Sequence, residues 1–328
     1  MKKTLSIIIP SYNVSAYIEE CLDSFTKERI EDLEVLVIDD GSKDDTLRKA
    51  RKYEEKFPGI IKVVHKENGG HGSTINTGLS ISNGEYVKIV DGDDWVDWKS
   101  LTSLINILKK KESDMVLTSI MQVYPDKQRL QTFFNGLEEG KKYSINDLQV
   151  IDYITMGSIA IRTDILKNKI HITENCFYVD IEFNAYCIAY SNTIQIVNLP
   201  LYMYRLGNTS QSVSKMNMYK NIEMLQRVSL GMASFFSSLD LKEGSKKELL
   251  LLRIGKLIRT TMLLFLASPE KEKGYKKMKE YIGKVNDYSE ELFTYVMEKW
   301  KVVAFTAGGS LTRFKLISNV YRIKYKFN

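Results

Sequence analysis

The first hundred residues alternate short apolar runs with longer polar segments of helical character. Four runs rich in Val and Ile are typical of buried strands: LSIII, LEVLVID, IIKVV and EYVKIVD. Helix-compatible segments lie between them, at residues 16–27, 44–56 and 73–82. This alternation predicts an α/β fold, a doubly wound and mostly parallel Rossmann-like sheet with helices on both faces. Ligands of such sheets bind at the carboxyl ends of the strands.

The second part of the chain has a different character. After about residue 215 it is rich in Leu, Met, Lys and Glu and has few helix breakers, which predicts a helical module. With 328 residues, 44% of them hydrophobic, the chain can bury the cores of two ordinary domains. We expect an α/β domain over residues 1–214 and a helical domain over residues 215–328.

Cysteines and apolar runs exclude several classes of protein. Three cysteines without a close pair indicate neither a disulfide framework nor a zinc site, and favour a reducing compartment. The apolar start of the chain is short and meets Pro10, so we interpret it as a strand and not as a signal peptide. The run at 249–268 is interrupted by Arg253, Lys256 and Arg259, so we expect no transmembrane helix.

The basic residues leave some alternatives open. We expect 249–268 to form a buried helix whose three basic residues face outward, with a membrane-surface helix or an oligomer contact as alternatives. The tail from Lys301 onward has six Lys or Arg and no acid. It is either a solvated helical face or a surface for an anionic membrane, an acidic partner or nucleic acid.

Acidic residues follow the fourth predicted strand in the segment VDGDDW. Asp91, Asp93 and Asp94 repel one another, so a counter-charge is expected near them. Their hard oxygen ligands suit Mg²⁺ or Mn²⁺. Alternatively they are turn residues before a helix that begins near Asp97.

Two further segments carry polar groups near the same edge. In IDDGSKDDT, Asp39 and Asp40 follow the second strand and can accept hydrogen bonds from a ribose or a base; an ordinary turn is the alternative. The glycine-rich segment 67–86 precedes a helix and can expose N–H groups to phosphate. It is neither a Walker A loop nor a Rossmann fingerprint, and we interpret its His71 as part of a flexible loop.

Taken together, SIIIPSYN, VLVIDDGSKDDT, NGGHGSTINTGL and NGEYVKIVDGDDW resemble, in order and spacing, the nucleotide-sugar domain of family 2 glycosyltransferases, which have the GT-A fold. The resemblance is strong over residues 4–100 and weaker to about 215. It implies a nucleotide-sugar-binding and catalytic domain over 1–214, with an acceptor part at 115–214. The helical module lies outside it.

The resemblance also implies site residues. Asp180 would be the catalytic base, and Asp91 and Asp93 would hold Mn²⁺ or Mg²⁺, with Asp94 supporting them. The residues implied in nucleotide-sugar binding are Pro10, Tyr12, Asp39, Asp40, Gly72, Asn76, Asp91, Gly92 and Arg205. Arg205 alternatively only neutralises the acids, and Trp95 and Trp98 are expected in the core, with stacking on a sugar ring as the alternative.

The chain departs from the family pattern at two positions. Ile75 precedes Asn76 where many members have an arginine, so one contact to an anion is missing. Val179 stands before Asp180 where the family has glutamate, and Glu182 is an alternative partner or base. A surface aspartate at a helix start is the alternative interpretation of Asp180.

The function that the resemblance implies is transfer of a hexose, glucose or galactose, from a UDP-sugar to a glycan or glycoprotein acceptor, with inversion. We expect a bacterial enzyme, in the cytoplasm or at the inner face of the membrane, with a homo-oligomer as an open option and no nucleic-acid partner. A non-catalytic nucleotide-sugar-binding module is the alternative. A sugar nucleotidyltransferase ranks last, because no basic, Gly-rich loop follows the first strand.

Overall fold

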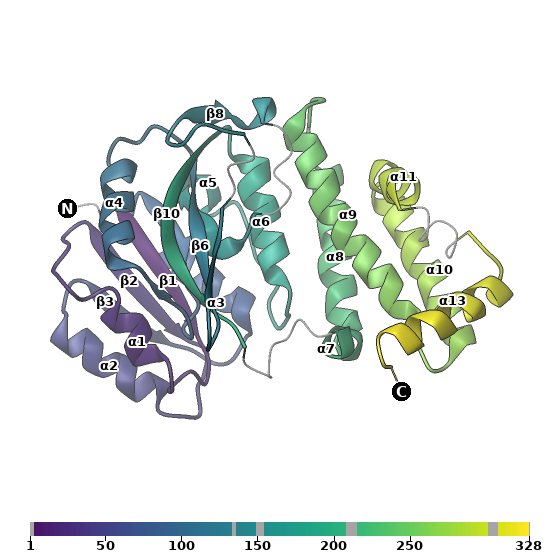
Figure 1. The fold of residues 1–328 in the computed structure, drawn as a ribbon, viewed down its shortest axis with the longest axis horizontal. Coiled ribbons are helices and arrows are strands. Elements are labelled where there is room, and N and C mark those ends of the chain that lie inside the picture. The colour runs from purple at the N-terminus through teal and green to yellow at the C-terminus, as the bar shows by residue number, and fades with distance from the viewer. Residues whose placement is uncertain (1–2, 133–135, 149–153, 208–214, 301–307, 328) are drawn as a thin grey trace. The chain divides into compact units, whose positions relative to one another are not determined.

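The computed structural model describes residues 3–132, 136–148, 154–207, 215–300 and 308–327 (Figure 1). The chain divides into two compact units, Met1–Asn208 and Thr209–Asn328. The boundary expected between residues 214 and 215 adjoins the segment 208–214, which lies outside the described residues. It stays a prediction.

The described part of the first unit contains a ten-stranded sheet. Its strands follow the order β3-β2-β1-β4-β9-β6-β10-β5, with β7 paired to β6 and β8 to β10. The strands are β1 (Leu5–Ser11), β2 (Leu33–Asp39), β3 (Ile61–His65), β4 (Tyr86–Ile89), β5 (Trp95–Val96), β6 (Met115–Val123), β7 (Gln128–Gln131), β8 (Lys142–Ser144), β9 (Ile159–Arg162) and β10 (Thr193–Arg205). β1 pairs in parallel with β2 and β4, and β2 with β3. The carboxyl ends of these four strands therefore meet at one edge.

The second half of the sheet is mixed. β9 runs antiparallel between β4 and β6, while β6 and β10 are parallel to each other. Side chains of β1 and β2 are almost completely buried. That burial requires cover on both faces, as the uninterrupted apolar runs predict.

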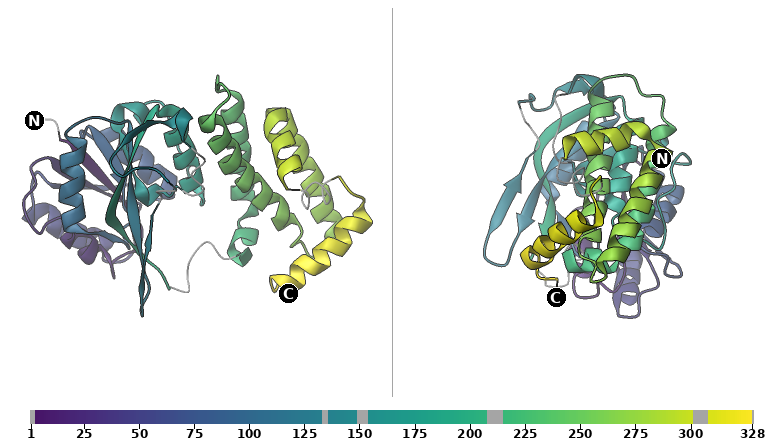
Figure 2. Two further views of the ribbon diagram at one scale, coloured as in Figure 1. Left: turned by 45° about the horizontal axis from the view of Figure 1, so that its top comes forward. Right: turned by 90° about the vertical axis from the view of Figure 1, so that its right-hand side faces the viewer.

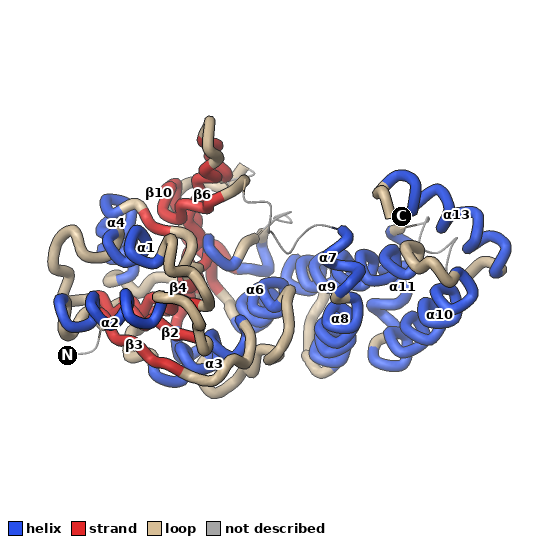
Figure 3. The backbone as a smooth tube through the Cα atoms, turned by 90° about the horizontal axis from the view of Figure 1, so that it is seen from below, coloured by secondary structure: helices blue, strands red, loops and turns tan. Residues whose placement is uncertain are grey.

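Helices cover the two faces of the sheet. They are α1 (Ile18–Asp23), α2 (Thr46–Lys56), α3 (His71–Ile81), α4 (Trp98–Leu108), α5 (Thr163–Leu166) and α6 (Val179–Tyr190). α3 and α6 lie on one side of the sheet and α1 and α4 on the other (Figures 1 and 3). The predicted strands and helices of the first hundred residues, and the α/β class, are confirmed.

The second unit is helical over its described residues, as expected (Figures 2 and 3). Its helices are α7 (Lys215–Lys220), α8 (Ile222–Ser237), α9 (Ser245–Phe265), α10 (Lys271–Tyr288), α11 (Glu290–Lys299) and α13 (Leu311–Lys324). α9 packs against α8, α10 and α11. No helix among the described residues is long and apolar enough to cross a bilayer.

One expectation about α9 is wrong. Lys256 is exposed and Arg259 is partly exposed, but Arg253 is buried at 8% exposure. The reason is that α9 is covered by neighbouring helices on more than one side, so a one-sided amphipathic pattern does not describe it.

Candidate active site

A cavity of about 650 Å³ opens at the carboxyl ends of the strands. Asp91, Asp180 and Tyr202 line it, together with residues of the β6–β7 hairpin such as Gln122 and Arg129. The resemblance predicts Asp91 and Asp180 to act on the same substrate, and they come from elements 89 positions apart in the chain. This cavity is the candidate active site.

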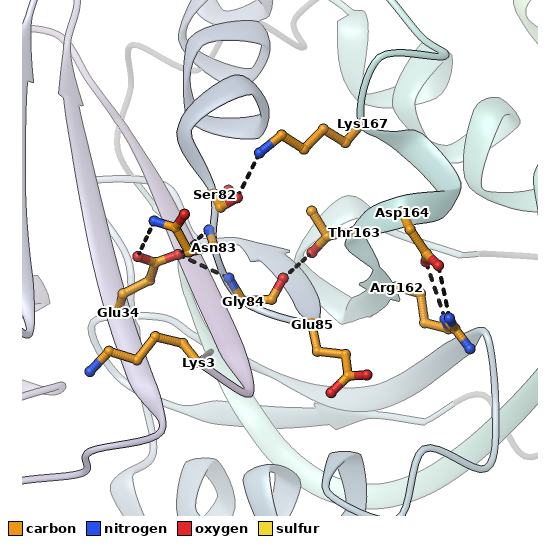
Figure 4. Close-up of a pocket in the computed structure, with 10 residues that line it drawn as sticks. All are labelled: Lys3, Glu34, Ser82, Asn83, Gly84, Glu85, Arg162, Thr163, Asp164 and Lys167. Carbon is orange, nitrogen blue, oxygen red and sulfur yellow. Dashed lines mark hydrogen bonds and ion pairs between the residues drawn. The ribbon is translucent and has the colours of Figure 1, made fainter. Parts of the chain in front are cut away.

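A second cavity, of about 590 Å³, lies at the opposite edge of the sheet (Figure 4). Its charged groups already satisfy one another or the backbone. Arg162 pairs with Asp164 through two hydrogen bonds, Lys167 donates to the Ser82 carbonyl oxygen at 2.8 Å, and Glu34 accepts from the N–H of Asn83 at 2.6 Å. These groups hold strand starts in place, and we assign them no ligand.

The acids after β4 lie close together and have perturbed pKa values. Burial and the charges of Asp91 and Asp93 raise the pKa of Asp94 to about 8. Burial and the charge of Asp91 also raise the pKa of Asp93. The repulsion expected among these acids thus contributes to the raised pKa values of two of them.

Tyr202 on β10 joins two of these acids. Its hydroxyl lies 2.5 Å from Asp94 Oδ2 and 3.1 Å from Asp91 Oδ2. Because a phenol has one proton, it can donate to only one of them. A proton on Asp94 at neutral pH, in line with its raised pKa, lets Asp94 donate to Tyr202 and Tyr202 donate to Asp91.

Two basic side chains lie near the acids. His71 Nε2 lies 3.1 Å from Asp91 Oδ1, and although burial opposes it, the hydrogen bond and charge of Asp91, with Asp180 and Asp93, raise the His71 pKa. These interactions with His71 outweigh burial and lower the pKa of Asp91. His71 is the first residue of α3, so the interpretation of this position as a flexible loop is wrong.

Arg205 lies at the end of β10. Its guanidinium donates to the Asp93 carbonyl oxygen at 2.9 Å and to Glu20 at 2.6 Å, and it stacks on Tyr17 and Trp95. The guanidinium thus contacts the backbone of the acidic loop, whereas the backbone N–H of Arg205 donates to Asp94 Oδ1 at 2.7 Å. Trp95 and Trp98 are each partly exposed, so the expectation that both lie in the core is wrong.

A buried lysine lies beneath this cluster. Lys88 on β4 is 0% exposed, and burial lowers its pKa to about 7. Its ammonium donates to the Gly157 carbonyl oxygen and lies 5.8 Å from the centre of the Tyr202 ring. A Cβ on Gly157 would lie 2.7 Å from that ring, so glycine leaves the space in which Tyr202 reaches the acids.

Asp39 lies at the end of β2 and is fully buried. His65 Nδ1 lies 2.6 Å from its Oδ2, which also accepts from the Ser42 N–H at 3.3 Å. Oδ1 has no hydrogen-bond partner among the described residues. Such an atom is costly to bury without a donor, so an external N–H or O–H is the expected partner. Pro10 on β1 lies opposite Ile38, the residue before Asp39 on β2, and Tyr12 is half exposed.

Asp40 has the opposite character. Its carboxylate accepts from Lys66 Nζ at 2.9 Å and from the N–H groups of Gly69 and Gly70 at 2.9 and 2.8 Å. Ser73 Oγ lies 3.3 Å away. The carboxylate thus secures the glycine loop before α3, and the predicted nucleotide-sugar contact of Asp40 stays a prediction.

Gly72 and Asn76 are also engaged within the protein. Asn76 exchanges hydrogen bonds with the backbone of Ile172 at 2.8 and 2.9 Å and donates to Glu174 at 3.0 Å. A Cβ on Gly72 would lie 2.2 Å from the Thr173 carbonyl oxygen. Both residues attach α3 to the segment before α6, and the predicted donor contacts stay predictions. Gly92 is buried, and its N–H donates to the Pro10 carbonyl oxygen at 3.1 Å.

The first turn of α6 carries the two candidate bases. Asp180 lines the cavity with an exposed side chain, as the alternative of a surface aspartate at a helix start predicts, and partial desolvation by the cavity wall raises its pKa. Glu182 is buried and accepts from the N–H and the hydroxyl of Thr173, both at 3.0 Å. Val179 is 1% exposed and apolar. Of these carboxylates, only Asp180 lines the cavity.

The side chains of this site can supply only some of the ligands that a divalent metal needs. Among the described residues, no group of three or more His, Cys, Asp or Glu side chains can hold a metal ion. The carboxylates of Asp91 and Asp93 are nevertheless the hard donors that Mg²⁺ or Mn²⁺ takes, and the raised pKa of Asp93 reflects an uncompensated charge. An ion here would need further ligands from a substrate, as Mg²⁺ commonly takes from phosphates.

Sequence reasoning missed three residues of this region: His65, Lys88 and Gly157. His65 ends β3 and reaches Asp39 on the neighbouring strand. A lysine in the middle of an otherwise apolar strand was the available signal for Lys88. Nothing in the local sequence marks Gly157.

Comparison with known proteins gives this chain relatives. The sequence model described as glycosyl transferase family 2 matches residues 6–168. "Uncharacterized glycosyltransferase EpsJ" of Bacillus subtilis (strain 168) is 38% identical over 112 residues, 34% of this chain and 32% of that protein. The cholesterol galactosyltransferase of Borreliella burgdorferi is 30% identical over 236 residues, 67% of this chain and 65% of that protein. The chain thus spans 32% and 65% of the lengths of these two relatives.

A solved structure agrees with the fold over both units. The crystal structure of S. aureus TarS 1-349 in complex with UDP-GlcNAc matches with a TM-score of 0.74 at 23% identity, covering 98% of this chain and 92% of that one. The expected GT-A fold is confirmed.

Proposed function

Because this chain belongs to glycosyltransferase family 2 through its residues 6–168, we propose that it is an inverting transferase that moves a hexose from a UDP-sugar to an acceptor hydroxyl. The observation that carries the proposal is the shared cavity, in which Asp91 and Asp180 face one space and His71 interacts electrostatically with both. We propose a bacterial glycan as the acceptor, because the relatives described above are bacterial. Glucose and galactose are the proposed sugars.

We propose that the donor's base binds at the end of β2. Uracil offers a ring N–H, and Asp39 Oδ1 is a buried acceptor that lacks a donor. His65 occupies the other oxygen and thereby leaves Oδ1 for the base. Cytosine has an unprotonated nitrogen at the corresponding ring position, so it would leave Oδ1 unsatisfied, and such a mismatch is strongly discriminated. Pro10 and Tyr12 would pack near the base.

The diphosphate would lie over the acids that follow β4. Asp91 and Asp93 would hold Mn²⁺ or Mg²⁺ there, and when bound the ion would neutralise charge on the departing diphosphate. His71 would supply a positive charge from the protein. Ile75 is buried and contributes none, whereas His71 lies one helical turn earlier on the same face of α3.

Asp180 would take the proton from the acceptor hydroxyl as that oxygen attacks the anomeric carbon. A raised pKa makes a carboxylate a stronger base, closer to the working pH. Glu182 is a weaker candidate because its carboxylate is buried and already accepts two hydrogen bonds from Thr173. The β6–β7 hairpin, with Gln122 and Arg129, would contact the acceptor.

The test is release of UDP from UDP-glucose, UDP-galactose and UDP-GlcNAc, with Mn²⁺ or EDTA. The wild type is compared with Asp180→Asn, Asp91→Asn and the matched control Asp164→Asn, whose carboxylate lies at the second cavity. We expect one donor to be hydrolysed slowly, and expect EDTA and both site variants, but not the control, to abolish the reaction.

Calorimetry separates this proposal from the binding-module alternative. UDP is expected to bind and CDP is not, and Asp39→Ala is expected to remove the difference. Binding of UDP without turnover of any donor, even with an acceptor glycan supplied, would favour a non-catalytic module. Release of pyrophosphate instead of UDP would favour a nucleotidyltransferase.

A further inference from the structure

The net charge of the chain is concentrated at its end. The chain has 47 Lys and Arg against 41 Asp and Glu. Six of these basic residues and none of the acids follow residue 300, so the first 300 residues are formally neutral and the last 28 carry the whole charge of +6. Four of the six lie on α13, which contains no acid.

One face of α13 is fixed to its own unit. Phe314 is 0% exposed and makes an edge contact with Tyr275, with the ring centres 5.6 Å apart. Ser318 Oγ donates to the Leu266 carbonyl oxygen at 2.7 Å, and Arg322 donates to the Ala267 carbonyl oxygen. Phe327, just after the helix, packs on Tyr219 and Tyr321. These contacts set the rotation of the helix about its axis.

The opposite face carries an apolar stripe. Leu316, Val320 and Ile323 are 67%, 62% and 80% exposed, and their spacing of four and three residues aligns them on one side of the helix. Most large apolar side chains of the chain are buried, so three adjacent exposed ones on one helix are unusual.

Exposed basic residues flank this stripe on one side. They are Arg313 and Lys324. Lys315 and Arg322 lie toward the packed face, where Lys315 contacts Glu272 and Arg322 donates to the Ala267 carbonyl oxygen. Lys326 is exposed just beyond the helix. An exposed apolar stripe beside exposed cations is typical of a helix that lies in the headgroup region of a membrane.

We propose that the outward face of α13 docks on an anionic lipid bilayer, with Leu316, Val320 and Ile323 inserted among the headgroups and the flanking cations on lipid phosphates. A second copy of the chain is the weaker occupant, because two such faces would bring their cations together with no acid between them. The neighbouring basic helix α9 cannot play this part, since most of its apolar residues are covered within its unit. The inference rests on this unit alone and holds whichever donor the first unit uses.

The test is sedimentation of the full chain with vesicles, either of pure phosphatidylcholine or of phosphatidylcholine mixed equally with phosphatidylglycerol. We expect binding to the mixed vesicles only, weakened by added salt. The double variant R313Q/K324Q should bind about 25-fold more weakly, at about fivefold for each basic residue. Its matched control is K276Q/K277Q, which removes the same charge from exposed positions of α10 and should bind like the wild type.

The apolar stripe has its own variant, L316S/V320S/I323S, which alters only exposed positions and is expected to fold. This triple variant should lose vesicle binding, whereas Tyr288→Ser, which removes an exposed aromatic side chain elsewhere in the unit, should retain it. Circular dichroism and thermal unfolding check that each variant is folded. The proposal is overturned if R313Q/K324Q and K276Q/K277Q lose vesicle binding equally. It is also overturned if the wild type does not bind anionic vesicles. A wild-type dimer that L316S/V320S/I323S converts to a monomer, without vesicle binding, assigns the face to a second copy instead.

Discussion

The two acidic strand ends of the sheet use the same residue type in opposite ways. After β2, the carboxylate of Asp40 is surrounded by donors: a lysine, two backbone N–H groups and a serine hydroxyl. After β4, Asp93 and Asp94 have raised pKa values because burial and the charge of Asp91 outweigh the groups that stabilise their charged forms. The comparison teaches that an acidic motif marks a binding site only where the fold leaves its charge uncompensated. Asp40 stabilises the scaffold and Asp91 is paired with His71, whereas a bound cation would relieve the charge repulsion at Asp93 and Asp94.

The largest expected effect is on the β4 side. Asp93→Asn should lower donor turnover by about 10²-fold or more, because it removes charge stabilisation at the departing diphosphate. The same change should slightly raise the free energy of unfolding, since it removes a repelling charge. UDP release and urea denaturation measure the two quantities. A variant that loses stability along with activity would show that Asp93 belongs to the scaffold, like Asp40.

The next effect is on the β2 side. Asp40→Asn should lower the free energy of unfolding by about 2–3 kcal/mol, because charge-assisted hydrogen bonds to Lys66 and the loop amides are lost. Urea denaturation measures this, with Asp45→Asn as a control that should lower stability far less, because Asp45 loses only an exposed ion pair with Arg48. Turnover per folded molecule should fall far less than in Asp93→Asn. Full stability with abolished turnover would reverse the comparison between the two strand ends.

A smaller effect is expected from the residue that makes room for Tyr202. Gly157→Ala should destabilise the protein by about 1–3 kcal/mol, because the added methyl overlaps the tyrosine ring. It should also lower turnover, because Tyr202 holds Asp91 and Asp94. Gly231→Ala, at an exposed helical position with no atom near the new Cβ, is the matched control and should not destabilise. Unchanged thermal unfolding of Gly157→Ala would exclude this role.

The last expected effect is a dependence of stability on pH, which is spread over several pH units. The pKa of Asp94 rises from 3.8 to about 8 on folding, so the folded state binds the proton more tightly. Stability that is present at low pH is therefore lost as the pH rises toward 8, by at most about 1.4 kcal/mol per pH unit. Urea denaturation between pH 5 and 8 in EDTA should show this slope in the wild type and a flatter one in Asp94→Asn. Identical slopes would mean that the acids after β4 are compensated after all.

Much of the fold could be predicted from local sequence. The Val- and Ile-rich runs gave the strands β1 to β4, and the alternation with helical segments gave a parallel arrangement. The three segments PSYN, DDGSKDD and DGDDW were expected at one edge, and they do lie at the ends of β1, β2 and β4. The burial of Arg253 could not be predicted, because it depends on which helices pack around α9.

The site could be predicted only in part. Asp91, Asp93, Asp180 and Arg205 were singled out from motifs, but their partners were not. Asp91 meets Tyr202 from 111 positions away, and Asp39 meets His65 from 26. The choice between Asp180 and Glu182 depended on a contact with Thr173 that no spacing rule indicates.

The sequence by itself determined the order of strands and helices, the acids at the strand ends and the charge of the tail, because these follow from short-range pattern and composition. The tertiary structure alone decided which acids have their charge compensated, which side of α13 faces outward and where Tyr202 lies. The physical reason is that burial and hydrogen bonding depend on neighbours that the fold brings together from distant parts of the chain. A carboxylate's chemistry is set by those neighbours, and the residue's own identity leaves it open.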